Sequence, residues 1–179
     1  MTTTMTAKFE AVNMVANAGG SISFMVKGNP TVQRRTVMCW KGRPQPCLLD
    51  PSKNTKDLFA KAVRLEMKAI GLPELLYFAE STAIALRVKF VLPRPKKDLV
   101  KKKDGLTGLT DNASSFPRGK DVDNLLKFVQ DALQQTLYMN DSDIVRVEAE
   151  KCYCNEDITE SLGWTELHFW KVDAVVCLD

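Results

Sequence analysis

The sequence has little of what structural zinc sites, disulfide frameworks and membrane spans are built from. It contains one histidine and five cysteines in 179 residues. The five are Cys39, Cys47, Cys152, Cys154 and Cys177. Their odd number and scattered positions predict reduced thiols in a reducing compartment, and one histidine leaves few ligands for zinc. No apolar run approaches the roughly 20 residues of a membrane span, so we expect no membrane association.

Length and the N-terminal segment predict the domain organisation. A chain of 179 residues is long enough for one domain with its own core and short for two. Residues 1–20 are polar and lack both the basic start and the apolar middle of a secretory signal. We therefore expect a flexible leader over residues 1–20, one domain over residues 21–179, and a cytoplasmic protein.

The net charge of +3 hides two strongly basic groups. The first is Arg34, Arg35, Lys41 and Arg43, and the second is Arg94, Lys96, Lys97, Lys101, Lys102 and Lys103. Each group alone is typical of a solvated surface. Two such groups on one small domain favour an anionic polymer as partner, because each cation near a phosphate releases counterions.

Hydrophobic spacing predicts alternating strands and helices. Strands are predicted at residues 22–27, 84–92, 145–149 and 165–176, and helices at residues 53–70 and 124–136. In the first helix, Leu58, Ala62, Leu65 and Ala69 recur at the spacing of one helix face. Residues 94–119 are basic and contain three glycines, which predicts a long loop. The order β, α, β, α, β, β predicts an α/β (α+β) fold, a single compact domain with a mixed sheet packed by helices.

Three aspartates around the second helix form the candidate site. Asp121 and Asp123 lie two residues apart before the helix, so in an extended segment their carboxylates point to the same side. Lys127 lies one helical turn beyond Asp123, and Asp141 begins the strand that follows. Clustered carboxylates repel unless a cation lies between them, and Mg²⁺ prefers such oxygen ligands together with substrate phosphates. A nearby lysine can stabilise charge that develops on a phosphate.

The same residues also have a purely structural interpretation. Asp123 or Asn124 can cap the helix, and Asp-Ser-Asp at residues 141–143 is a common turn sequence. Asp141 returns to Asp123 only if the next strand folds back along the helix, which is about 20 Å long. Spacing alone leaves both a metal site and a set of capping residues open.

The order of these residues resembles the signature of RusA-type Holliday-junction resolvases. Lys-Asp-Val-Asp-Asn-Leu-Leu-Lys at residues 120–127 is followed by Asp-Ala-Leu at 131–133, Asn-Asp-Ser-Asp-Ile-Val at 140–145, and Lys151. Upstream, Gly-Asn-Pro at 28–30 with the arginine pair at 34–35, and Pro-Arg-Pro-Lys at 93–96, are similar to the first half of that family. The resemblance covers roughly residues 22–175.

The resemblance implies a homodimeric α/β nuclease that cuts four-way DNA junctions by paired nicks with Mg²⁺, for which Mn²⁺ can substitute. It assigns metal binding and catalysis to Asp121, Asp123 and Asp141, and the active-site lysine to Lys127. The residues assigned to DNA contact are Arg34, Arg35, Arg94, Lys96, Lys97, Lys120 and Lys151. Branched DNA is the expected partner, in the cytoplasm of a cell or of the host of a phage or virus.

Some positions depart from the family pattern. Gly119-Lys120 stands in place of Lys-Pro, and Asn140 stands in place of an aspartate. Asp143 is either a fourth acidic group of the site or part of the turn, and the turn is the favoured interpretation. We interpret Asp131 as a structural residue of the helix. Phe116, in the basic loop, could stack on an unpaired base, but a packing role is the favoured interpretation.

Two alternatives remain beside the resolvase interpretation. The first is a less selective nuclease that cuts flaps or forks with the same site. The second is a non-catalytic module that binds DNA junctions, in which the aspartates only cap and turn.

Overall fold

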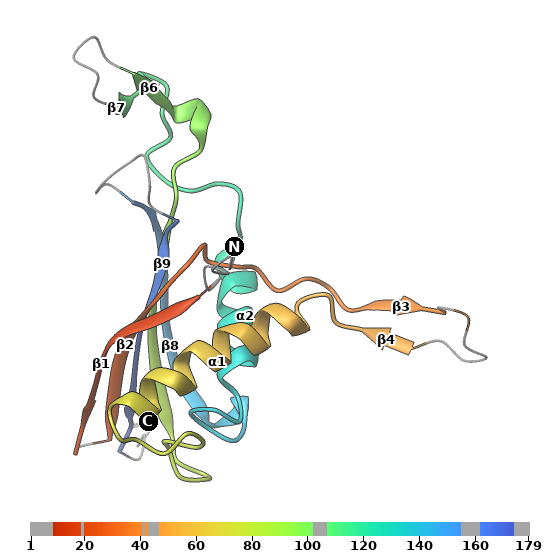
Figure 1. The fold of residues 1–179 in the computed structure, drawn as a ribbon, viewed down its shortest axis with the longest axis vertical. Coiled ribbons are helices and arrows are strands. Elements are labelled where there is room, and N and C mark those ends of the chain that lie inside the picture. Colours follow the sequence, from red (N-terminus) through yellow and green to blue (C-terminus); the bar gives the residue numbers. More distant parts are fainter. Residues whose placement is uncertain are drawn as a thin grey trace, which may run out of the picture.

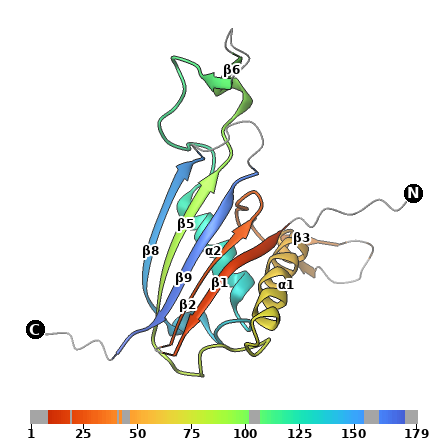
Figure 2. The same cartoon turned by 60° about the vertical axis from the view of Figure 1, so that its left-hand side comes forward.

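The computed structural model describes residues 9–18, 20–40, 42, 47–101, 107–154 and 162–173. A five-stranded sheet has the order β1-β2-β9-β5-β8, and two helices cover one of its faces (Figures 1 and 2). The sheet comprises β1 (Glu10–Asn17), β2 (Ser21–Lys27), β5 (Ile84–Leu92), β8 (Ile144–Tyr153) and β9 (Trp164–Lys171), and the helices are α1 (Lys53–Ala69) and α2 (Val122–Leu133). Shorter elements are β3 (Val37–Cys39), β4 (Cys47–Leu49), η1 (Lys96–Asp98), β6 (Leu99–Lys101), β7 (Thr107–Leu109) and η2 (Asp141–Asp143).

The sheet is mixed, which confirms the predicted fold class. Among the described strands, β5 and β8 run parallel, and the other neighbours run antiparallel. A parallel pair requires a crossover connection, and α2 supplies it. The start of α2 therefore lies at the same end of the sheet as the ends of β5 and β8. This topology brings Asp121 close to the last residues of β8.

The six predicted elements correspond to β2, α1, β5, α2, β8 and β9. Residues 174–176 of the last predicted strand lie outside the described residues. The same holds for Lys41, Arg43, Lys102 and Lys103 of the basic groups, and for Cys177. The expected long loop over residues 94–119 is partly structured, because η1 and the β6–β7 hairpin lie in it and project beyond the end of the sheet (Figure 1).

Residues 10–17 correct the expected leader over residues 1–20. They form β1, an edge strand paired with β2. A register shift between Val12 and Val15, with a positive φ of 56° at Asn13, lets Ala11 and Met14 both reach the core. The sequence pattern missed the strand because this bulge breaks the alternation of apolar and polar residues.

The buried face of α1 also differs from the predicted stripe. Leu58 and Leu65 are 47% and 59% exposed, whereas Phe59, Val63 and Met67 are buried. The buried residues repeat every four positions and carry the side chains that fill the space under the sheet. Phe59 packs edge-on against the Phe128 ring of α2 with centroids 5.7 Å apart. No helix in the described ranges is long and apolar enough to cross a membrane.

After Arg35 the chain leaves the domain as an arm formed by the β3–β4 hairpin (Figure 1). Cys39 and Cys47 are register partners across this hairpin, and their Sγ atoms lie 3.0 Å apart. Two of the described cysteines are therefore neighbours in space rather than scattered.

Candidate active site at helix α2

The segment that connects β2 to β3 holds the start of α2. The backbone N–H of Gln33 donates to the carbonyl oxygen of Asn124 at 2.8 Å. Lys120 donates from Nζ to the Asn29 side-chain oxygen at 2.7 Å and to the Pro30 carbonyl. The family-like Gly-Asn-Pro turn thus acts as a support for the acidic segment.

The end of β8 holds the same segment from the other side. Lys151 donates from Nζ to the carbonyl oxygen of Lys120. Both lysines are half-buried, and burial lowers the pKa of Lys120. Lys120 and Lys151 were predicted to contact DNA; in the structure their ammonium groups bond to backbone and side-chain oxygens that position Asp121.

Asp121, rather than Asp123 or Asn124, is the N-cap residue of α2. Its backbone is extended, and its carbonyl accepts the N–H of Leu125 at 3.1 Å. Its carboxylate makes no capping hydrogen bond with the described backbone, so its oxygens are not used up by the helix start. Asp123 lies in the first turn, and both side chains are exposed. Carboxylates at this end of a helix are favoured by its dipole.

Lys127 connects the helix to the third aspartate. Its ammonium lies 2.8 Å from Oδ1 of Asp131, one turn along α2, and 3.5 Å from Oδ2 of Asp141 in η2. The hydrogen bond to Asp131 raises the pKa of Lys127, with further contributions from the charges of Asp131 and Asp141. The contact with Asp131 therefore holds the Lys127 ammonium beside Asp141.

The turn before β8 fixes the backbone of Asp141. Asn140 and Asp143 form a reciprocal capping box around η2, in which the N–H of Asn140 donates to Oδ2 of Asp143 at 3.2 Å. This agrees with the interpretation of Asp143 as a turn residue. The box occupies Asn140 and Asp143 and leaves the 55% exposed side chain of Asp141 facing Lys127.

Asp131 has a second lysine partner that the sequence did not indicate. Lys56 of α1 lies 3.3 Å from Oδ2 of Asp131 and 2.5 Å from Oδ2 of Asp50. Burial acts to lower the pKa of Lys56, but its hydrogen bonds to Asp50 and Asp131 outweigh this effect, and the pKa is raised. The result is a chain of alternating charges, Asp50–Lys56–Asp131–Lys127–Asp141, which we call the charge chain.

The three predicted metal ligands are not gathered around one point. Within the described ranges, no group of three histidine, cysteine, aspartate or glutamate side chains is close enough to hold a metal ion. Carboxylates repel one another when no cation lies between them, and the only ion-pair partner of the Asp141 carboxylate within the described residues is the Lys127 ammonium. The donor set nevertheless fits Mg²⁺, because hard oxygens are exposed at Asp121, Asp123 and Asp141, and Mg²⁺ usually combines few carboxylates with substrate phosphates.

The other residues predicted to contact DNA divide into exposed and engaged side chains. Arg34 and Arg35 are exposed at the root of the arm, and Lys96 and Lys97 are exposed on η1. Arg94 is half-buried: it donates to the Ser114 carbonyl at 2.8 Å and lies over the Tyr153 ring, 4.6 Å from its centroid. The exposed four are free to approach a phosphate backbone, whereas Arg94 also braces the basic loop.

Phe116 corrects the expected packing role. It is 54% exposed, and the Arg118 guanidinium lies 5.2 Å from its ring centroid. The ring therefore covers no core. It presents an accessible aromatic face in the loop that leads to Asp121.

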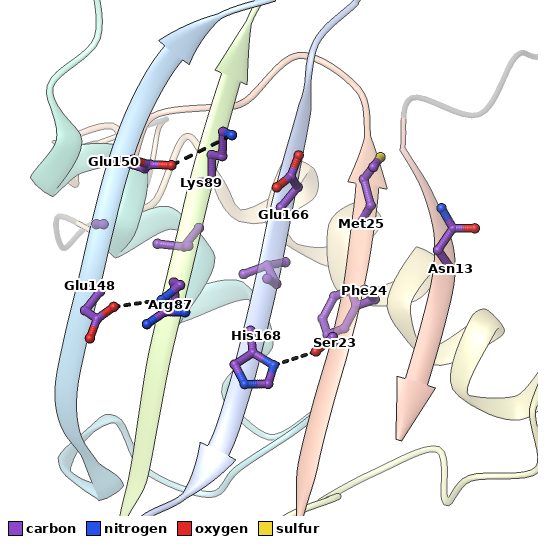
Figure 3. A pocket seen from close by; sticks show the side chains of 13 residues that line it. Asn13, Ser23, Phe24, Met25, Arg87, Lys89, Glu148, Glu150, Glu166 and His168 are labelled. Atoms are coloured by element: carbon purple, nitrogen blue, oxygen red, sulfur yellow. Dashed lines mark hydrogen bonds and ion pairs between the residues drawn. The ribbon is translucent and has the colours of Figure 1, made fainter. Parts of the chain in front are cut away.

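A hollow on the opposite face of the sheet is separate from this chemistry. It has a volume of about 720 Å³ and is lined by residues of β1, β2, β5, β8 and β9, none of them a predicted site residue (Figure 3). Its floor carries the contacts Arg87–Glu148 at 2.7 Å, Lys89–Glu150 at 3.9 Å and Ser23–His168 at 2.5 Å. The charges of the Arg87–Glu148 and Lys89–Glu150 pairs offset one another, as is usual for a solvated sheet face.

Comparison with known proteins then decides the family. Residues 27–160 match the family described as Endodeoxyribonuclease RusA. The chain belongs to the RusA family. Membership implies a Holliday-junction resolvase nuclease that binds branched DNA. No curated protein and no solved structure matches the chain.

The match of the RusA family includes every predicted site residue, from Arg34 to Lys151. Sequence reasoning missed the role of Asp131 as the anchor of Lys127, although the spacing of four residues was a visible signal. It also missed Lys56 and Asp50. These lie 75 and 81 positions before Asp131, and no local pattern connects them to it.

Proposed function

We propose that this RusA-family chain is a Mg²⁺-dependent endodeoxyribonuclease that resolves four-way DNA junctions by paired cuts, acting as a homodimer on cytoplasmic DNA. The observation that carries the proposal is the placement of Lys127. The Lys127 ammonium lies 3.5 Å from the Asp141 carboxylate. Lys127 belongs to α2, whose N-cap residue is Asp121, and the Asp121 carboxylate makes no capping hydrogen bond with the described backbone.

In this proposal Asp121, Asp123 and Asp141 hold the metal ion. A Mg²⁺ ion held by them would supply Lewis-acid chemistry: it would polarise a phosphoryl oxygen and lower the pKa of a water. Lys127 keeps its hydrogen bond to Asp131 and donates a second one to the oxygen on which negative charge develops. Asp131 thus orients the ammonium, and the half-buried Lys120 and Lys151 fix the backbone from which Asp121 projects.

The basic residues of the two loops supply the DNA contacts. Arg34 and Arg35 directly follow Gln33, whose backbone N–H donates to Asn124 in the first turn of α2, and Lys96 and Lys97 lie on η1. Lys120, Lys151 and Arg94 contribute positive charge between them. A two-fold dimer would present two such sites to a roughly two-fold junction, which is why paired cuts require a second copy.

Cleavage of matched DNA substrates tests the proposal. A four-way junction, a fork and a linear duplex of the same sequence are incubated with the protein in Mg²⁺, in Mn²⁺ and in excess chelator. We expect paired, symmetric nicks in the junction that require the metal ion. Equal rates on the three substrates would replace the resolvase with a less selective nuclease. Junction binding without cleavage under all conditions would leave only a binding module.

A further inference from the structure

Lys56 occupies an unusual place for a lysine. Its side chain is only 15% exposed, although the two flanking lysines of α1, Lys53 and Lys61, are exposed. A buried ammonium is costly unless it is paired, and here two carboxylates, those of Asp50 and Asp131, pair with it. The side chain therefore has one well-defined position between α1 and α2.

The two oxygens of Asp131 are divided between two lysines. Oδ2 faces Lys56 at 3.3 Å, and Oδ1 faces Lys127 at 2.8 Å. The carboxylate is 21% exposed, so it has little freedom to rotate away from either partner. The position of its outer oxygen, and with it that of the Lys127 ammonium, depends on what holds the inner oxygen.

The inner end of the charge chain is anchored to backbone. Oδ1 of Asp50 accepts the N–H of Ser52 at 2.8 Å, and the Gln33 side chain approaches the same oxygen at 3.5 Å. Gln33 in turn donates its backbone N–H to Asn124 in the first turn of α2. The chain of contacts thus begins and ends on the segments that frame the candidate site.

Lys127 needs such an anchor because half of its side chain is exposed. A free lysine side chain has high rotamer entropy and samples many positions. Catalysis by a positioned charge requires that charge to be in place before the reaction. A salt bridge to a mobile carboxylate would not provide this, whereas one to a carboxylate fixed by Lys56 does.

We propose that Lys56 is a positioning residue of the active site: together with Asp50 it fixes Asp131, so that Asp131 holds the Lys127 ammonium beside Asp141. This inference rests on the proposed nuclease function. It assigns to α1, which carries none of the family-like motif residues, a direct influence on the charge that acts at the phosphate.

Kinetics of three single variants test this role. Lys56→Met should lower kcat for junction cleavage roughly 10- to 100-fold, as is usual for residues that orient an active group. The KM should stay within about twofold, because Lys56 does not touch DNA in this proposal. Lys56→Arg should restore most of the activity, since a guanidinium can contact both carboxylates. Lys61→Met, an exposed lysine on the same helix, is the matched control and should leave kcat unchanged.

A double variant distinguishes positioning from a general structural role. In a Lys127→Ala background, Lys56→Met should cause no further loss of kcat, because the group that it positions is gone. An equal loss in both backgrounds would overturn the proposal. The proposal would also be overturned if Lys56→Met raised the KM and left kcat unchanged.

A chemical readout separates this inference from the proposed function. The acetylation rate of Lys127 by an N-hydroxysuccinimide ester is followed by mass spectrometry in the metal-free protein. We expect a severalfold faster reaction in Lys56→Met than in the unchanged protein, and no change in Lys61→Met. Equal rates in Lys56→Met and the unchanged protein would overturn the positioning role whatever the nuclease assays show. Faster acetylation of Lys127 in Lys56→Met, in a protein that never cuts DNA, would support the positioning of Lys127 by Lys56 and reject the proposed nuclease function.

Discussion

The two faces of the sheet carry similar charges in different settings. On the helix face, Lys56 is 15% exposed and contacts two carboxylates of which no more than 26% is exposed. On the open face, the Lys89 and Glu150 side chains are 41% and 69% exposed and lie 3.9 Å apart. Figure 3 shows that the open-face pairs lie across the strands, pointing away from the helices.

This difference in burial determines which charged side chains are held in a fixed position. An exposed pair is screened by water and salt, so its geometry is loose and its energy small. The charge chain lies between two helices, where burial strengthens each contact and limits side-chain motion. Its outer end, Lys127 and Asp141, is half-exposed and accessible to a substrate. A rigid inner part and an accessible outer part are what a catalytic ammonium requires.

The largest effect is expected from the aspartates of the helix face. Asp123→Asn should lower junction cleavage by at least about 100-fold, because it removes a carboxylate from the proposed metal site. Junction affinity, measured by gel shift, should stay equal or increase, since a negative charge near phosphates is lost. Glu150→Gln makes the same chemical change on the open face and should leave cleavage unchanged. Equal losses in the two variants would contradict the distinction between the faces.

The next effect concerns stability. Lys56→Met should lower the free energy of unfolding by about 1.5–3 kcal/mol, the range for hydrogen bonds to charged groups. Lys89→Met on the open face should cost less than about 1 kcal/mol. Urea denaturation measures both.

The pH dependence of this difference has a definite sign. The pKa of Lys56 is raised in the folded protein above its ordinary 10.5. Its contribution to stability is therefore complete below pH 10.5 and is lost as the pH rises through the raised pKa. The difference in the free energy of unfolding between Lys56→Met and the unchanged protein should become smaller at that high pH. A difference that persists would contradict the ion-pair explanation.

A smaller effect is expected on DNA affinity. Replacing Arg34 and Arg35 together by alanine should weaken junction binding and reduce the slope of log K against log salt by about 2, because two phosphate contacts are lost. Arg87→Ala on the open face should change neither quantity. Fluorescence anisotropy across a salt series measures the slope. An unchanged slope in the double variant would show that the DNA does not contact Arg34 and Arg35.

The smallest effect concerns His168 on the open face. Burial, with a contribution from the charge of Arg87, lowers the pKa of His168 below its ordinary 6.5. Stability that depends on the neutral ring is present above pH 6.5 and is lost as the pH falls through the lowered pKa. His168→Gln should flatten this part of the stability curve between pH 7 and 5, with no effect on cleavage. A changed cleavage rate in His168→Gln would contradict the expectation that the open face takes no part in cleavage.

The sequence predicted the fold well where periodic patterns are regular. The alternation in residues 84–92 and the spacing around Val129 and Leu133 identified β5 and α2, which place the acidic segment. The pattern failed where geometry is irregular: a bulge at Asn13 hid β1. In α1, a second apolar stripe at Leu58 and Leu65 hid the buried one.

For the site, the motif indicated candidate residues but not how their side chains are held. The spacing of Asp121, Asp123 and Lys127 follows from helix geometry and could be predicted. The contact between Lys56 and Asp131 joins residues 75 positions apart on two helices. It depends on how α1 packs on α2, which no local pattern encodes.

A structure of the protein with Mn²⁺ and a bound four-way junction would locate the metal ion and the Lys127 ammonium relative to the DNA. We expect Mn²⁺ between Asp121, Asp123 and Asp141. The Lys127 ammonium should keep its contact with Asp131 and turn from Asp141 toward a phosphate oxygen. Mn²⁺ bound on the open face, or a junction bound with the three aspartates far from the phosphates, would contradict it.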